Sequence, residues 1–146
     1  MNATQKIYSQ VFSNVYALML KTQSYHWHVT GIEFKSLHLF FEDQYQQLFE
    51  FVDLIAERMR VMGFHVPASF NLMNDLKQLS DANNDLTADE MVNDLTRDYV
   101  TLIDNIDELM SKAKEDNDEG ALSLFSDIVQ QLEKNLWMCR VTTGGV

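Results

Sequence analysis

Residues that break or cross-link a chain are scarce in this sequence of 146 residues, which has one cysteine, one proline and five glycines. A single cysteine excludes a disulfide framework and a cysteine-rich zinc or iron–sulfur site. So few glycines and prolines exclude a sandwich or barrel with many tight turns. No apolar stretch approaches the roughly 18 residues of a membrane-spanning helix, and no basic segment followed by an apolar run opens the sequence. We therefore expect a cytoplasmic protein without a membrane partner.

Basic charge is also scarce. The chain carries 22 acidic and 11 basic side chains, a net charge of −11, and the acidic ones concentrate in residues 81–119. Unaided binding to nucleic acid needs basic groups that displace counterions, so this balance argues against direct DNA binding. The acidic stretch either attracts cations or is a solvated helix surface that keeps the protein soluble.

Apolar residues are abundant and recur at spacings of three and four, which is typical of amphipathic helices. These spacings predict four long helices and one short one, at about residues 4–29, 35–62, 71–79, 88–118 and 119–141. Thr87 and Glu90 match a capping box that opens the third long helix. In the last helix, the apolar stripe includes Leu136 and Trp137, which we expect in the core.

Four long helices of this kind predict an all-α four-helix bundle, formed by a single domain over residues 1–146. The short helix lies in the connection between the second and third long helices. This connection spans about 24 residues, which is longer than ordinary links between helices. It is long enough to run the length of the bundle, so we expect an up-up-down-down arrangement.

The second helix carries one imidazole and three carboxylates at helical spacing. His38 and Glu42 are four residues apart, as are Asp53 and Glu57. Helical geometry places all four within a stripe about 100° wide. Imidazole and carboxylate without thiolate suit iron, manganese or zinc. Two other interpretations stay open: an exposed polar stripe, and an ion pair between Glu57 and a neighbouring arginine.

A metal site built from both pairs needs two copies of the chain. His38 and Asp53 are 15 residues apart, which is about 22 Å along one helix, whereas the ligands of one ion lie within a few ångströms. Two copies of the helix that cross antiparallel near residues 47 and 48 bring His38 and Glu42 of one copy to Asp53 and Glu57 of the other. A twofold axis then generates two equivalent sites per dimer.

Two segments of the sequence resemble a known family. Residues 24–45 are SYHWHVTGIEFKSLHLFFEDQY, and residues 52–63 are VDLIAERMRVMG. The order His-Trp, Gly, Leu-His and Asp-x-x-Ala-Glu-Arg at these intervals resembles Dps, the miniferritin family of DNA-binding proteins from starved cells. The resemblance implies a ferritin-like bundle that assembles into a hollow dodecamer. It also implies oxidation of Fe(II), preferably with hydrogen peroxide, storage of the ferric mineral inside, and protection against oxidative stress.

The same resemblance implies roles for individual residues. It implies a ferroxidase centre shared by two subunits, with His26 and His38 from one subunit and Asp53 and Glu57 from its partner. Glu42 stands where the family has an acidic bridging or second-site group, most often Asp. Trp27 stands where the family places an aromatic side chain beside the iron, as an electron donor that limits the escape of radicals.

One departure from the family concerns DNA. The Lys-rich arm with which Dps proteins bind DNA is missing here, so direct DNA binding is not expected from the resemblance. An alternative function is a structural dodecamer that compacts DNA or binds a surface with little ferroxidase activity, and its mark would be such an arm. Two further residues are expected to be structural: His28, exposed or hydrogen-bonded, and Cys139, buried as a small hydrophobe.

Overall fold

The computed structural model describes residues 1–145, and all regular structure in this range is helical. The helices are α1 (Ala3–His28), α2 (Phe34–Val61), α3 (Phe70–Leu76), α4 (Ala88–Glu115) and α5 (Glu119–Thr142). The predicted bundle of four long helices with a short extra one is confirmed. None of the helices described is long and apolar enough to cross a membrane.

Local hydrogen bonds explain where two of the helices begin or end. The Thr87 hydroxyl accepts the Glu90 N–H, and the Glu90 carboxylate accepts the Thr87 N–H, which is the predicted capping box of α4. The short helix α3 ends at Leu76, earlier than expected. The Asn14 side chain of α1 accepts the Gln78 N–H at 2.7 Å and holds the chain after α3 in an extended course.

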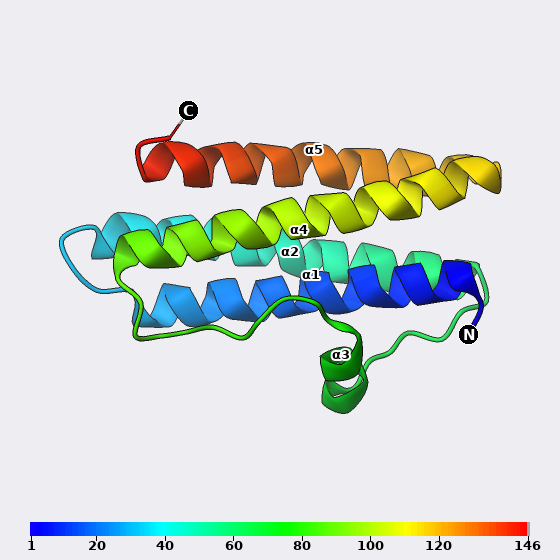
Figure 1. Ribbon diagram of the computed structural model, residues 1–146, viewed down its shortest axis with the longest axis horizontal. Coiled ribbons are helices and arrows are strands. Elements are labelled where there is room, and N and C mark those ends of the chain that lie inside the picture. The colour runs from blue at the N-terminus through cyan, green and yellow to red at the C-terminus, as the bar shows by residue number, and fades with distance from the viewer. Residues whose placement is uncertain (146) are drawn as a thin grey trace.

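The direction of the helices differs from the expected one. Helices α1 and α2 are antiparallel, as are α4 and α5, whereas residues 62–87 return along the bundle and make α4 parallel to α2 (Figure 1). The order is therefore up-down-down-up, and the up-up-down-down expectation is wrong. The cause is the length of the links: residues 29–33 and 116–118 are too few to run back along a helix about 40 Å long.

The core lies between the long helices and is built from the predicted apolar stripes. Fully buried examples, one from each long helix, are Val15, Leu48, Leu95 and Leu132. Trp137 is an exception, because its side chain is 56% exposed. It directly follows the half-buried Leu136, and the two side chains point about 100° apart, which places Trp137 at the edge of the apolar stripe. Cys139 is fully buried, as expected.

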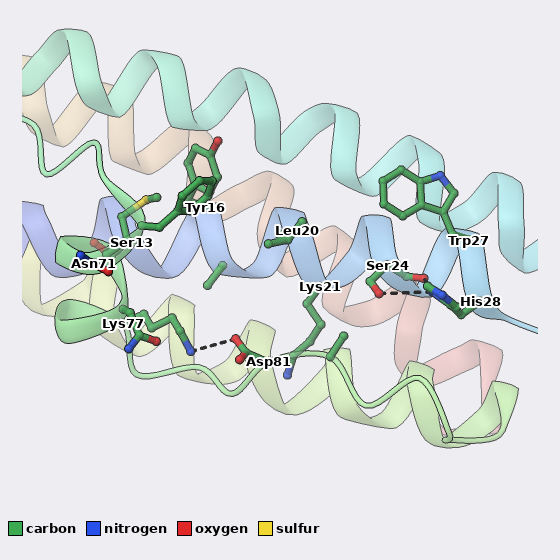
Figure 2. A pocket seen from close by; sticks show the side chains of 15 residues that line it. Ser13, Tyr16, Leu20, Lys21, Ser24, Trp27, His28, Asn71, Lys77 and Asp81 are labelled. Atoms are coloured by element: carbon green, nitrogen blue, oxygen red, sulfur yellow. Dashed lines mark hydrogen bonds and ion pairs between the residues drawn. The ribbon is translucent and has the colours of Figure 1, made fainter.

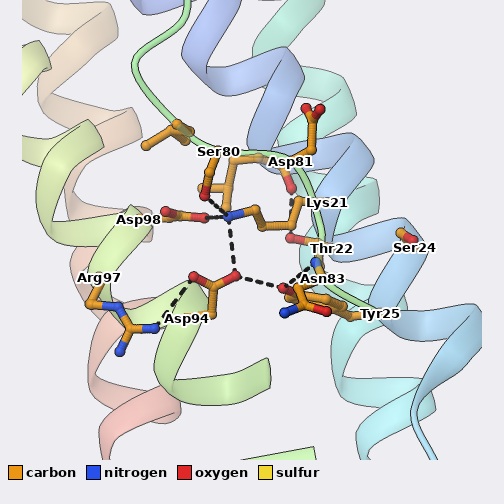
Figure 3. A network of polar contacts seen from close by, with 12 residues as sticks. Lys21, Thr22, Ser24, Tyr25, Ser80, Asp81, Asn83, Asp94, Arg97 and Asp98 are labelled. Atoms are coloured by element: carbon orange, nitrogen blue, oxygen red, sulfur yellow. Dashed lines mark hydrogen bonds and ion pairs between the residues drawn. The ribbon is translucent and has the colours of Figure 1, made fainter. Parts of the chain in front are cut away.

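A buried polar cluster fixes the C-terminal part of α1 (Figure 3). The Lys21 Nζ lies 2.8 Å from an Asp98 oxygen and 3.1 Å from an Asp94 oxygen, both on α4. The Tyr25 hydroxyl donates to Asp94 at 2.6 Å and accepts the N–H of Asn83 in the connection at 3.2 Å. These bonds join α1, α4 and the connection beside the last turn of α1, which carries His26 and His28.

Candidate metal centre

Two imidazole rings meet where α1 ends and α2 begins. The rings of His26 and His38 stack with centroids 3.7 Å apart and planes inclined by 14°. The His26 Nδ1 lies 2.7 Å from the His38 carbonyl oxygen, and the His38 Nδ1 lies 2.6 Å from the His26 carbonyl oxygen. A carbonyl only accepts, so each Nδ1 carries a hydrogen and donates it. In a neutral ring, Nε2 then carries the free lone pair, to which a metal ion can bind.

The ends of the helices explain why these reciprocal bonds form. The last carbonyls of a helix have no N–H partner within that helix, and His26 lies in the last turn of α1, so its carbonyl is open to His38. The His26 side chain is buried, with the residue only 6% exposed. A buried N–H needs an acceptor, and the His38 carbonyl provides it.

Two aromatic side chains of α2 pack against the histidine pair. Phe34 stacks on His38 with ring centroids 5.0 Å apart, and Tyr45 meets His26 edge-on with centroids 5.2 Å apart. Glu42 is half-buried one turn after His38. Phe34 and Tyr45 were not among the residues predicted from the sequence, although their positions four residues before and seven residues after His38 place them on the same face of the helix.

Trp27 follows His26 in the chain and is exposed at the surface. It is 59% exposed and lines a hollow of about 620 Å³ between α1, α3 and the connection, beside Leu20 and Ser24 (Figure 2). Successive helix positions point about 100° apart, so Trp27 and the inward-facing His26 have different surroundings. His28 is exposed, as expected, and its Nδ1 donates to the Ser24 carbonyl at 2.7 Å. The role of Trp27 beside an iron centre stays a prediction that involves a second copy.

Asp53 and Glu57 lie together on the exposed side of α2, far from the histidines. Helix α2 is continuous from Phe34 to Val61, so the spacing of about 22 Å to His38 holds in the folded chain. A hydrogen bond with Asp53 and the charge of that carboxyl raise the pKa of Glu57. Within residues 1–145 of one chain, no three His, Cys, Asp or Glu side chains are close enough to hold a metal ion.

The two arginines that neighbour Glu57 in the sequence bind other groups in the structure, which bears on the interpretation that Glu57 pairs with one of them. Arg58 pairs with Asp118 at the start of α5, and Arg60 donates to the Phe64 carbonyl. Both arginines therefore have bonds at the end of α2, and the carboxylate pair remains available at the surface. A chain by itself holds two incomplete halves of the predicted site.

Known proteins resemble this chain over nearly its whole length. The ferritin-like domain family matches residues 7–144. The DNA protection during starvation protein 2 of Bacillus anthracis is 31% identical over 123 residues, which are 84% of each chain.

Two solved structures resemble this chain in three dimensions as well. The Dps protein of Bacillus brevis superposes with a TM-score of 0.91 at 26% identity, over 97% of this chain and 99% of its own. The Dps protein of Vibrio cholerae, described as a member of the ferritin-like diiron-carboxylate superfamily, superposes with a TM-score of 0.91 at 25% identity, over 94% of this chain and 87% of its own. With sequence and fold in agreement over this length, the chain belongs to the ferritin-like family and, within it, to the Dps miniferritins.

Proposed function

We propose that this protein oxidises and stores iron, and that its ferroxidase centres form between two copies of the chain. Fe(II) is the substrate, and hydrogen peroxide is the preferred oxidant. The observation that carries the proposal is the His26–His38 stack, in which both Nδ1–H groups are bound to carbonyls and both Nε2 atoms are left for a metal. Membership of the ferritin-like family supports the same function.

The donor set of the proposed centre suits iron. It combines His26, His38 and Glu42 of one copy with Asp53 and Glu57 of a second copy that crosses α2 antiparallel. Imidazole nitrogen and carboxylate oxygen are ordinary ligands of Fe(II), and an incompletely filled coordination sphere leaves room for peroxide. The mutual effect of Asp53 and Glu57, which raises the pKa of Glu57 in the single chain, is relieved when a cation lies beside both carboxylates.

The electron count explains why a centre for two ions is useful. Each of two Fe(II) ions gives one electron to hydrogen peroxide, the O–O bond breaks, and two hydroxide ions form. No hydroxyl radical is released when both electrons arrive together. Trp27 is proposed as an aromatic electron donor at the interface between the two copies.

Storage follows from assembly. We propose that the chains form a hollow dodecamer in the cytoplasm, in which Fe(III) hydrolyses to a mineral. The net charge of −11 for each chain attracts cations and raises their local concentration. Removal of both Fe(II) and peroxide then protects the cell against oxidative stress.

Exchange of subunits between two inactive variants tests this proposal. His38→Ala and Asp53→Ala should each lose most peroxide-driven Fe(II) oxidation as a homo-oligomer, because every centre lacks a ligand. The two variants are then unfolded, mixed equally and reassembled. About half of the dimers are mixed, and one of the two centres in each mixed dimer is intact, so about a quarter of wild-type activity should return.

The controls separate the interface from other causes of failure. Wild-type protein taken through the same unfolding and reassembly shows whether the treatment itself costs activity, and native mass shows whether the mixture has assembled. A centre built within one chain would stay inactive in every mixture. Absence of recovered activity in a correctly assembled mixture would therefore contradict the two-chain centre.

A further inference from the structure

The hydroxyl of Tyr25, the residue directly before His26, joins α1 to two other segments (Figure 3). It donates to an Asp94 oxygen of α4 at 2.6 Å and accepts the N–H of Asn83 in the connection at 3.2 Å. The Tyr25 side chain is fully buried, so water does not replace either partner. A buried hydroxyl with both partners in place fixes the segments that it joins.

The ring of the same residue reaches the second helix of the histidine pair. It packs on Phe41 of α2 with centroids 6.3 Å apart. Phe41 is fully buried and lies three residues after His38, about one helical turn away. Tyr25 therefore contacts α2, α4 and the connection, although it belongs to the turn of α1 that carries His26.

The last turn of α1 is a place where a helix ordinarily frays. Helix α1 ends at His28, its final carbonyls lack N–H partners within the helix, and the link that follows is exposed over residues 30–33. The stack of His26 on His38 and their two bonds to carbonyls depend on where this turn lies. Because the groups of a binding site must be held within about 0.5 Å, bonds that stop the turn from fraying also keep the His26 imidazole in place.

We infer that Tyr25 is a positioning residue of the metal centre, whose hydroxyl holds the His26 turn against α4 and the connection so that His26 and His38 meet. The inference rests on the proposed ferroxidase function. Loss of the hydroxyl should weaken metal binding although no ligand is removed. Hydrogen-bond partners that orient a metal ligand directly change metal affinity by about 10–100-fold. Tyr25 acts through the backbone of the neighbouring residue, so we expect about tenfold, the lower end of that range.

Binding of Co(II) to matched variants of the assembled protein tests this role. Co(II) binds nitrogen and oxygen ligands as Fe(II) does, and its visible absorption reports the coordination of the ion. Tyr25→Phe removes the hydroxyl and keeps the ring against Phe41. Tyr99→Phe is the control, because it also removes a fully buried hydroxyl with two bonds, one to Gln44 at 3.2 Å and one from Asn135 at 3.4 Å. Chemical denaturation of both variants measures how much stability each has lost.

The expected result is that Tyr25→Phe binds Co(II) about tenfold more weakly than the wild type, whereas Tyr99→Phe retains the wild-type affinity and spectrum. Wild-type affinity in Tyr25→Phe, or an equal loss in both variants, would overturn the inference. The wild type and His38→Ala are measured first. If the wild type binds no Co(II), or if His38→Ala binds it equally well, the proposed centre itself fails and the inference fails with it, before any tyrosine is changed.

A second pair of variants tests the same bond from α4, which matters if Tyr25→Phe does not assemble. Asp94→Asn and Asp94→Leu both remove the charge beside Lys21, but only the amide keeps an oxygen that accepts the Tyr25 O–H. Co(II) should bind more tightly to Asp94→Asn than to Asp94→Leu. Equal affinities in the two assembled proteins would overturn the role of the hydroxyl.

Discussion

The buried ammonium of Lys21 offers a sharp test of how α1 is held against α4. Its side chain is 1% exposed and pairs with Asp98 at 2.8 Å and Asp94 at 3.1 Å. Lys21→Met retains most of the volume and removes the charge, so two carboxylates lose their buried cation. Breaking a buried pair from one side costs about 3–5 kcal/mol. This is a large part of the about 5–15 kcal/mol that stabilises an ordinary domain.

The pH dependence of this loss follows from Asp98. Burial raises the pKa of Asp98 above its usual range, even though Lys21 opposes the shift. Without Lys21 the pKa rises further. A carboxyl whose pKa is higher in the folded than in the unfolded chain destabilises the fold above that pKa, where it must be charged, and ceases to do so once it is protonated. The deficit of Lys21→Met should therefore be greatest at neutral pH and shrink on acidification.

Chemical denaturation followed by circular dichroism measures both effects, at matched protein concentration because assembly contributes to stability. The double variant Lys21→Met with Asp98→Asn is the matched control, since it removes one of the two stranded charges and should recover part of the loss. A Lys21→Met protein within about 0.5 kcal/mol of the wild type at neutral pH, the range of ordinary surface substitutions, would refute the reasoning. A deficit that does not change with pH would refute the role of Asp98.

Two further predictions concern reactivity and charge. Burial raises the pKa of the Cys139 thiol to about 11, so the folded protein should resist iodoacetamide at mildly alkaline pH until denaturant is added; mass spectrometry measures the modification, and rapid labelling of the native protein would contradict the buried environment. Each copy adds a net charge of −11 to the assembly, so duplex DNA should not shift in a metal-free gel at neutral pH, whereas a shift that weakens steeply with salt would reveal a basic patch.

The long helices were predictable because their apolar residues repeat with the period of the helix. In α4, Met91, Leu95 and Leu102 all lie in the core, as the spacing requires. The capping box at Thr87 located the start of that helix, because its hydrogen bonds depend on residues only three positions apart. The relative directions of the helices depend also on the lengths of all the links. The prediction used only the long connection, which can run the length of the bundle, and therefore gave the wrong order.

Contacts between distant residues were harder to predict. Lysine is seldom fully buried, so nothing in the helical spacing of α1 places Lys21 inside; its carboxylate partners are more than seventy residues away and meet it only when α4 packs beside α1. The stack of His26 on His38 depends in the same way on the short link after α1, which brings two helix turns into register. Spacing identified the two histidines, but not their reciprocal bonds to the backbone.

The arrangement of α2 connects the proposed chemistry to assembly. His38 lies near the start of this helix and Asp53 lies well beyond its middle, and the helix is uninterrupted between them. No change of a side-chain rotamer closes a gap of about 22 Å, and bending the helix that far would break the core that Leu48 and Ile55 help to form. A second copy closes the gap without deforming either chain, because antiparallel crossing exchanges the two ends of the helix. The proposed centre therefore exists only in the oligomer, so a substitution that separates the copies should abolish iron oxidation while leaving each chain folded.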